Sequence, residues 1–188
     1  MHVGPDEFAE LLGEVVPLLN DVGAEDWSKP AGNGLEWTCW QTVDHTIDVL
    51  FSYSLQLASQ TRSGFLPFSE LRAQPNASAF DLIAGLEGVG TMFLAVARTA
   101  PTDAVASDGV RLLSSFDWCA RAAYELVLHT YDVLSGLGVD WEPPADLCRS
   151  IVSTESLWML DRDVAGAAPD PWTALLLGSG RPGPSGST

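Results

Sequence analysis

Basic residues are scarce in this chain. Its 188 residues include only 9 Lys and Arg against 25 Asp and Glu, which gives a formal net charge of −16 and a pI of about 4.2. A chain with this charge is repelled by phosphate backbones and by anionic lipid surfaces, so nucleic-acid binding and peripheral membrane binding are disfavoured. The acidity indicates nothing positive about a substrate.

Cysteines and long apolar runs are also few. The three cysteines, Cys39, Cys119 and Cys148, form no CxxC pair, which argues against a disulfide framework and a cysteine zinc site. Free cysteines of this kind are usually small core residues. The first ten residues contain no apolar signal-peptide core, and we find no run of about 18 apolar residues, so we expect no membrane span and a cytoplasmic protein.

Strand-like alternation is missing, whereas helical periodicity is widespread. With 46% hydrophobic residues, the chain can form one well-buried core. We expect an all-α fold, a four-helix bundle with one or two additional C-terminal helices, in a single domain over residues 1–178. The end of the chain, 179–188, is rich in Gly, Pro and Ser and is predicted to be flexible. The predicted helices cover 5–22, 38–60, 79–98, 116–135, 144–160 and 172–177.

Local signals support these helices. Thr38 and Gln41 form a capping-box pattern, with Trp37 placed to act as a hydrophobic staple. Three glycines between 85 and 90 each disfavour a helix interior by about 1 kcal/mol relative to Ala. They indicate either close helix packing or a break near Gly88.

The segment 121–138 carries the most informative pattern. Glu125, His129 and Asp132 lie at i, i+4 and i+7, which places them on one stripe of a helix, and Arg121 and Trp118 share that stripe. A carboxylate and an imidazole one turn apart can bind the same metal ion. A polar stripe is equally typical of a solvated helix face, so spacing alone leaves both interpretations open.

His45 is one of three histidines, with His2 and His129. In a bundle it could converge with Glu125 and His129 to give two imidazoles and one carboxylate, a set that leaves an open position on zinc and also suits ferrous iron. The sequence contains no HExxH, no Glu-x-x-His pair and no glycine-rich phosphate loop, so those alternatives are set aside.

Three segments together resemble a known family. Residues 35–45, LEWTCWQTVDH, resemble the "EWT, then H" segment of DinB-like proteins, and 125–132, ELVLHTYD, resemble their "ExxxH, then D" helix. Asp170-Pro171-Trp172 followed by LLLG is similar to a C-terminal element of short actinobacterial relatives. The resemblance spans most of residues 5–182 and looks closest to the N-terminal domain of mycothiol-dependent maleylpyruvate isomerases, whose further C-terminal domain has no counterpart here.

This resemblance implies a DinB-like bundle whose metal ion is held by His45, Glu125 and His129, with zinc favoured and iron or nickel possible. It implies that Asp132 serves catalysis by hydrogen-bonding a ligand imidazole or a bound molecule, without ligating the ion. Mycothiol would bind at the open position, and Trp40, Trp118 and Arg121 are our candidates for cofactor binding.

The function implied is isomerisation or S-transfer on a small electrophilic substrate, by a thiol cofactor that the metal activates. A non-catalytic metal-binding bundle and a purely structural bundle are the alternatives. The expected partners are a small thiol and the electrophile, in a monomer or homodimer.

Overall fold

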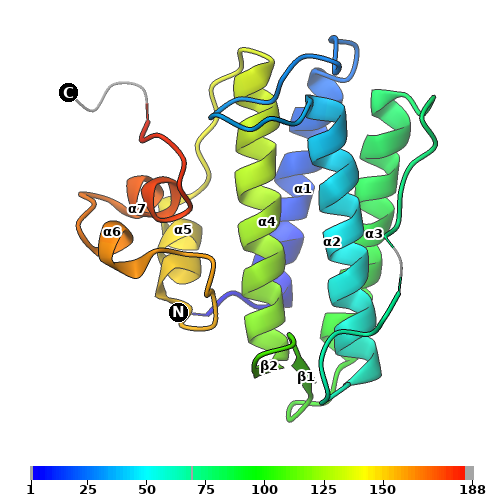
Figure 1. Cartoon of the computed structure of the whole chain (residues 1–188), viewed down its shortest axis with the longest axis vertical. Coiled ribbons are helices and arrows are strands. Elements are labelled where there is room, and N and C mark those ends of the chain that lie inside the picture. Colours follow the sequence, from blue (N-terminus) through cyan, green and yellow to red (C-terminus); the bar gives the residue numbers. More distant parts are fainter. Residues whose placement is uncertain (1, 69, 185–188) are drawn as a thin grey trace.

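The computed structural model describes residues 2–68 and 70–184, which form seven helices and one small hairpin (Figure 1). The structure is mostly helical, which confirms the all-α class. Four helices are long: α1 (Pro5–Asp21), α2 (Cys39–Ser59), α3 (Ala79–Thr99) and α4 (Ser115–Gly136). The short elements are β1 (Val105–Ser107), β2 (Leu112–Ser114), α5 (Ala145–Ser153), α6 (Arg162–Gly166) and α7 (Pro171–Gly178).

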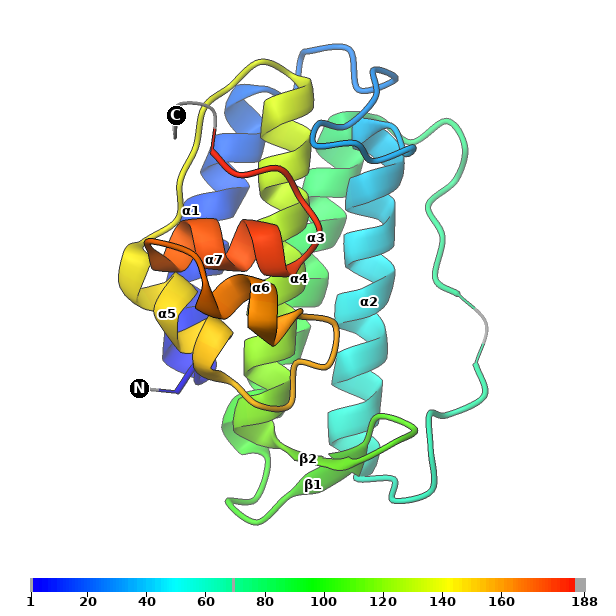
Figure 2. The ribbon, with the colours of Figure 1, turned by 60° about the vertical axis from the view of Figure 1, so that its left-hand side comes forward.

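The four long helices form a bundle in which α1 and α2 each pack against both α3 and α4. In Figure 1, α1 and α4 run upward while α2 and α3 run downward. Two long connections make this order possible. Residues 22–38 cross one end of the bundle, and residues 60–68 and 70–78 lie along its outside, as Figure 2 shows.

Side-chain caps set where these helices begin. Thr38, Ser78 and Ser114 each accept a hydrogen bond from the backbone three residues on, and the side chain there returns one to the cap backbone. The capping box predicted at Thr38 is therefore confirmed. α4 begins at Ser115, one residue before the predicted range of 116–135, because Ser114 is the residue that pairs with Asp117.

Two predictions about secondary structure are wrong. The absence of strands is contradicted by β1 and β2, which pair antiparallel with Val105 opposite Ser114; strands of three residues are too short for alternation to reveal. The helix predicted over 144–160 is only α5, since it ends at Ser153 and turns lead on to α6. The helix expected over 172–177 corresponds to α7, capped by Asp170.

The glycines of α3 permit close packing and do not break the helix. α3 continues through Gly88, and the Cα of Gly90 lies so near α1 that an added Cβ would meet Leu12 at 2.7 Å. By length and composition alone, α3 could cross a membrane, because it has many apolar side chains and few charges; this differs from our expectation of no membrane span. In the structure α3 packs on α1 and α2, and 28% of its most apolar stretch is buried.

The connection over the bundle end is fixed to the last turn of α4. Gly32 N–H donates to the carbonyl of Asp132 at 2.7 Å, and an added Cβ on Gly136 would lie 2.5 Å from the carbonyl oxygen of Pro30. Only glycine fits where two backbones come this close. The contact therefore determines where residues 30–38 lie relative to α4.

This close approach generates a prediction about stability. Gly136→Ala should destabilise the protein by about 1–3 kcal/mol, because the new methyl group meets backbone atoms that cannot move without displacing the loop. Gly88→Ala is the matched control, since nothing lies within 4 Å of its added Cβ, and it should stabilise by about 0.5–1 kcal/mol through helix propensity. Urea denaturation measures both, and a Gly136→Ala protein at least as stable as wild type would contradict the packing described.

Candidate metal centre

His45, Glu125 and His129 meet between α2 and α4. One ligand atom from each lies within 4.8 Å of the other two, a spacing at which all three could hold a single metal ion. His129 Nε2 is 3.3 Å from Glu125 Oε2, and the rings of His45 and His129 stand perpendicular with centroids 5.2 Å apart. The convergence follows from the fold, because His45 lies in the second turn of α2 and the other two occupy successive turns of the helix packed against it.

The surroundings favour the ligating forms of Glu125 and His45, whereas the carboxylates beside His129 favour its protonated form in the absence of a cation. Burial alone would raise the pKa of Glu125, but His129, His45 and the hydroxyl of Tyr53, which donates to Oε1 at 3.3 Å, hold that pKa below its ordinary value. Burial, together with the nearby His129, lowers the pKa of His45, which favours the neutral imidazole. Burial likewise opposes protonation of His129, yet the carboxylates of Asp132 and Glu125 raise its pKa. A charged carboxylate thus lies beside two imidazoles.

Asp132 lies behind His129, on the side away from Glu125. Its Oδ2 is 3.3 Å from His129 Nδ1, and that nitrogen has no hydrogen-bond partner of regular geometry among the described residues. Arg181 and the amide of Asn33 both bond the Asp132 carboxylate. Burial would raise the pKa of Asp132, but Arg181 and His129 keep it lowered. The structure places Asp132 against a candidate ligand and outside the three-residue group.

Trp118 and Arg121 lie nearer the N-terminus of α4 than Glu125 does. The Trp118 ring is buried against Tyr53, with centroids 5.1 Å apart, and the guanidinium of Arg121 lies over it at 5.6 Å. Arg121 Nη2 donates to Asp108 at 2.5 Å and to the carbonyl of Ser156 at 3.1 Å. Both residues therefore share the predicted stripe, but Arg121 pairs with Asp108 and Ser156 and not with the histidines. The buried indole N–H of Trp118 has no hydrogen-bond partner among the described residues.

Trp40 is not brought to the centre. Its indole N–H donates to the carbonyl of Ala77 at 2.8 Å, and it lines a separate surface hollow with Trp27 and Pro75. The tryptophan beside the histidines is Trp37, whose ring is 4.7 Å from His45 and 6.2 Å from His129 and which is 39% exposed. We expected Trp37 only to act as a hydrophobic staple. Its position in the EWT segment, just before α2, was the sequence signal that could have placed it at the centre.

The three cysteines provide no reactive thiol. All are buried, and burial raises the pKa of Cys119 and of Cys148 to about 12 and also raises that of Cys39. A thiolate is the reactive form, so these side chains are poor nucleophiles at neutral pH. Any thiol chemistry at this centre would need a thiol from outside the chain.

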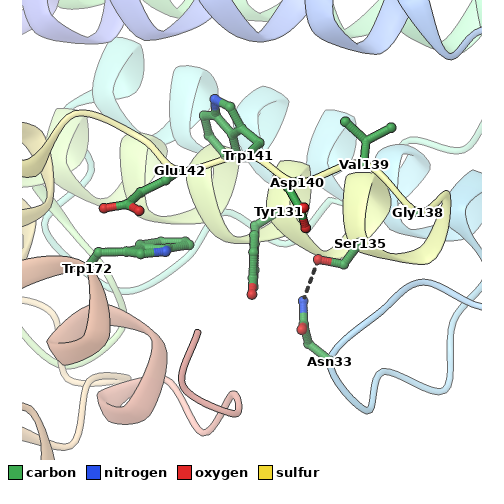
Figure 3. A pocket seen from close by; sticks show the side chains of 9 residues that line it. All are labelled: Asn33, Tyr131, Ser135, Gly138, Val139, Asp140, Trp141, Glu142 and Trp172. Carbon is green, nitrogen blue, oxygen red and sulfur yellow. Dashed lines mark hydrogen bonds between the residues drawn. The ribbon is translucent and has the colours of Figure 1, made fainter. Parts of the chain in front are cut away.

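A pocket of about 540 Å³ opens on the neighbouring face of α4 (Figure 3). None of His45, Glu125 and His129 lines it, but Asn33 does, and the Asn33 amide that faces Ser135 across this pocket is the same amide that bonds Asp132. The Asp132–Asn33 contact therefore lies between the candidate metal centre and the pocket. The other lining residues are Tyr131, Ser135, Gly138, Val139, Asp140, Trp141, Glu142 and Trp172.

Comparisons of the chain with family models, with curated proteins and with solved structures gave no match.

The buried pair of Arg121 and Asp108 generates a prediction about pH. Burial would raise the pKa of Asp108, but the backbone N–H groups of Arg111 and Val110 and the charge of Arg121 hold it below the ordinary value. A lowered pKa contributes stability above the unfolded-state value of about 3.9, and this contribution is lost as pH falls through the folded-state value. Asp108→Asn should therefore cost about 3–5 kcal/mol at pH 7, because it leaves a buried guanidinium unpaired.

Urea denaturation across pH measures this cost. The difference between wild type and Asp108→Asn should stay constant above about pH 5 and shrink below about pH 4. Asp146→Asn, which removes the exposed partner of Arg149, is the control and should change stability little. A difference that persists unchanged at low pH would show that the Asp108 charge is not what stabilises the fold.

Proposed function

We propose that this chain is a DinB-like, divalent-metal-dependent protein that uses a small thiol of the mycothiol type to act on a small electrophile. The observation that carries the proposal is the convergence of His45, Glu125 and His129 on one point. Two imidazoles and one carboxylate are three protein ligands, a number typical of catalytic zinc sites that keep one position open. Iron and nickel are also compatible with this donor set.

The charges around the centre support a bound cation. Arg121 and Arg181 pair with Asp108 and Asp132, two of three buried carboxylates here, and leave Glu125 without an arginine. An unbalanced charge in a buried site is costly. Either a proton on His129, whose pKa is raised, or a divalent cation would balance the Glu125 carboxylate. The Nδ1 atom of His129, facing Asp132, is placed as metal-bound imidazoles commonly are, with a carboxylate behind the ring.

A bound divalent ion would lower the pKa of a coordinated thiol and hold it as the thiolate near neutral pH. The chain's own residues would hold and orient the reactants. Trp37, partly exposed beside both histidines, would cover a bound molecule, and the Tyr53 hydroxyl fixes the Glu125 carboxylate. A thiol that adds to and leaves an activated double bond would give cis–trans isomerisation, and attack on an acceptor with a leaving group would give S-transfer.

The second candidate is a metal-binding bundle without catalysis. None of the three candidate metal ligands lines the 540 Å³ pocket. This favours the alternative, because a substrate bound in that pocket would not touch the ion. Thiol binding separates the two candidates.

The metal prediction can be tested directly. Purified wild-type protein should bind about one Zn²⁺ or Co²⁺ per chain, and His129→Ala and His45→Ala should each weaken binding strongly, because each removes one of three ligands. His2→Ala is the control, since His2 is exposed near the N-terminus and should not alter affinity. Metal analysis and Co²⁺ titration followed by visible absorption give the result. Unchanged binding by His129→Ala would show that the site is wrong.

The thiol prediction distinguishes catalysis from simple metal binding. Mycothiol should bind the metal-loaded protein with release of a proton, and binding should strengthen as pH rises toward the free thiol's pKa, because the thiolate is the ligand. Calorimetry in buffers of different ionisation enthalpy measures the proton. The metal-stripped protein is the control, and equal binding to both forms would exclude activation of the thiol by the metal.

A further inference from the structure

Arg181 connects the C-terminal segment to the metal centre. It follows α7 by a turn in which Gly180 has φ +80° and the Arg181 N–H donates to the carbonyl of Leu176 at 2.9 Å. Its guanidinium contacts both oxygens of Asp132: Nε lies 2.9 Å from Oδ1 and Nη2 lies 2.5 Å from Oδ2. We expected residues 179–188 to be a flexible tail. Residue 181 is instead attached to α4, and residues 185–188 lie outside the described part of the chain.

One of the two Asp132 oxygens that Arg181 contacts also faces His129. Oδ2 of Asp132 accepts from Arg181 Nη2 and lies 3.3 Å from His129 Nδ1. Asn33 donates to the other oxygen at 3.0 Å, so both carboxylate oxygens are fixed. Asp132 is fully buried and the Arg181 side chain is only 13% exposed. A fork of two N–H groups on a carboxylate fixes its plane as well as its position.

Docking of the C-terminal helices does not need this contact. Trp172 of α7 packs edge-on against Tyr131 of α4 at 4.9 Å, and α5 and α7 bury Ile151 and Leu175 in the common core. A buried ion pair adds little net stability compared with such apolar packing, because both charges lose their hydration. The arrangement of Arg181 is better explained by what it orients.

We propose that Arg181 is a positioning residue for the metal centre: it holds Asp132 so that His129 presents Nε2 toward Glu125 and His45. The inference rests on the proposed metal site and adds to it a residue from the far C-terminal segment. The order of contacts is Arg181 to Asp132, Asp132 to His129 Nδ1, and His129 Nε2 to the ligand group. The partners behind metal-ligating histidines generally tune affinity without changing the number of ions bound.

The first test is Co²⁺ titration of the full chain. Arg181→Gln should bind one ion per chain with affinity reduced by about 10–100-fold and an altered visible spectrum, as expected when a ligand's supporting contact is lost. Arg98→Gln is the matched control, because it removes the same charge from an exposed pair with Asp6 and should bind as wild type does. Arg181→Lys, which keeps the charge but loses the fork, should fall between the two and replaces the Gln variant if that variant does not fold.

The second test asks whether Arg181 acts through Asp132. Asp132→Asn should itself weaken Co²⁺ binding with unchanged stoichiometry, and adding Arg181→Gln to it should cause no further loss, because residues in one chain of contacts are not additive. Wild-type affinity in Arg181→Gln, or an equal further loss in the Asp132→Asn background, would overturn the inference. A wild-type protein that binds no Co²⁺ would instead overturn the proposed function.

Discussion

Burial of charged groups on one helix is the constraint on which this structure depends. α4 is enclosed by its neighbours, and Arg121, Glu125, His129 and Asp132 are all buried along it. An isolated charge in such a place would cost several kcal/mol, so each needs a partner from another part of the chain. The partners come from the β1–β2 turn, from α2, from the loop over the bundle end and from the segment after α7. The hydrogen bonds to these buried groups thus fix the positions of the irregular segments relative to α4.

The same constraint explains the role of elements that add little to the core. The hairpin places Asp108 beside Arg121, and its turn is closed by Val110 and Arg111 N–H groups that donate to the same carboxylate. The loop through Gly32 and Gly136 brings Asn33 to Asp132 and Trp37 to His45. The hairpin and the loop over the bundle end therefore each supply a partner to a polar residue of α4. Among the residues that the structure describes, no arginine or lysine pairs with Glu125, whose ionic contact is His129.

The features that could be predicted from the sequence are those set by residues close together in the chain. Helix boundaries followed from apolar periodicity and from Ser/Thr caps, and the stripe holding Glu125, His129 and Asp132 followed from helical spacing. His45 was a candidate because it is one of three histidines, but its assignment as a ligand depended on the family resemblance, since nothing in its own helix directs it toward α4. Asp108 and Arg181 could not be found, because each pairs with α4 through tertiary contacts 13 and 49 residues away in sequence. Arg181 lies in a stretch whose Gly and Pro content is typical of mobile tails, and Trp40 was preferred over Trp37 because the direction of the loop before α2 has no sequence signature.

The central claim is that His45, Glu125 and His129 together bind one divalent ion. X-ray absorption spectroscopy at the zinc edge of the metal-loaded protein tests it most directly, with His45→Ala as the comparison. The account predicts two imidazole nitrogens at about 2.0–2.1 Å and oxygen ligands, including the carboxylate, at about 2.0–2.2 Å. One imidazole should be lost in the variant. A spectrum without imidazole scattering, or one unchanged by His45→Ala, would contradict it.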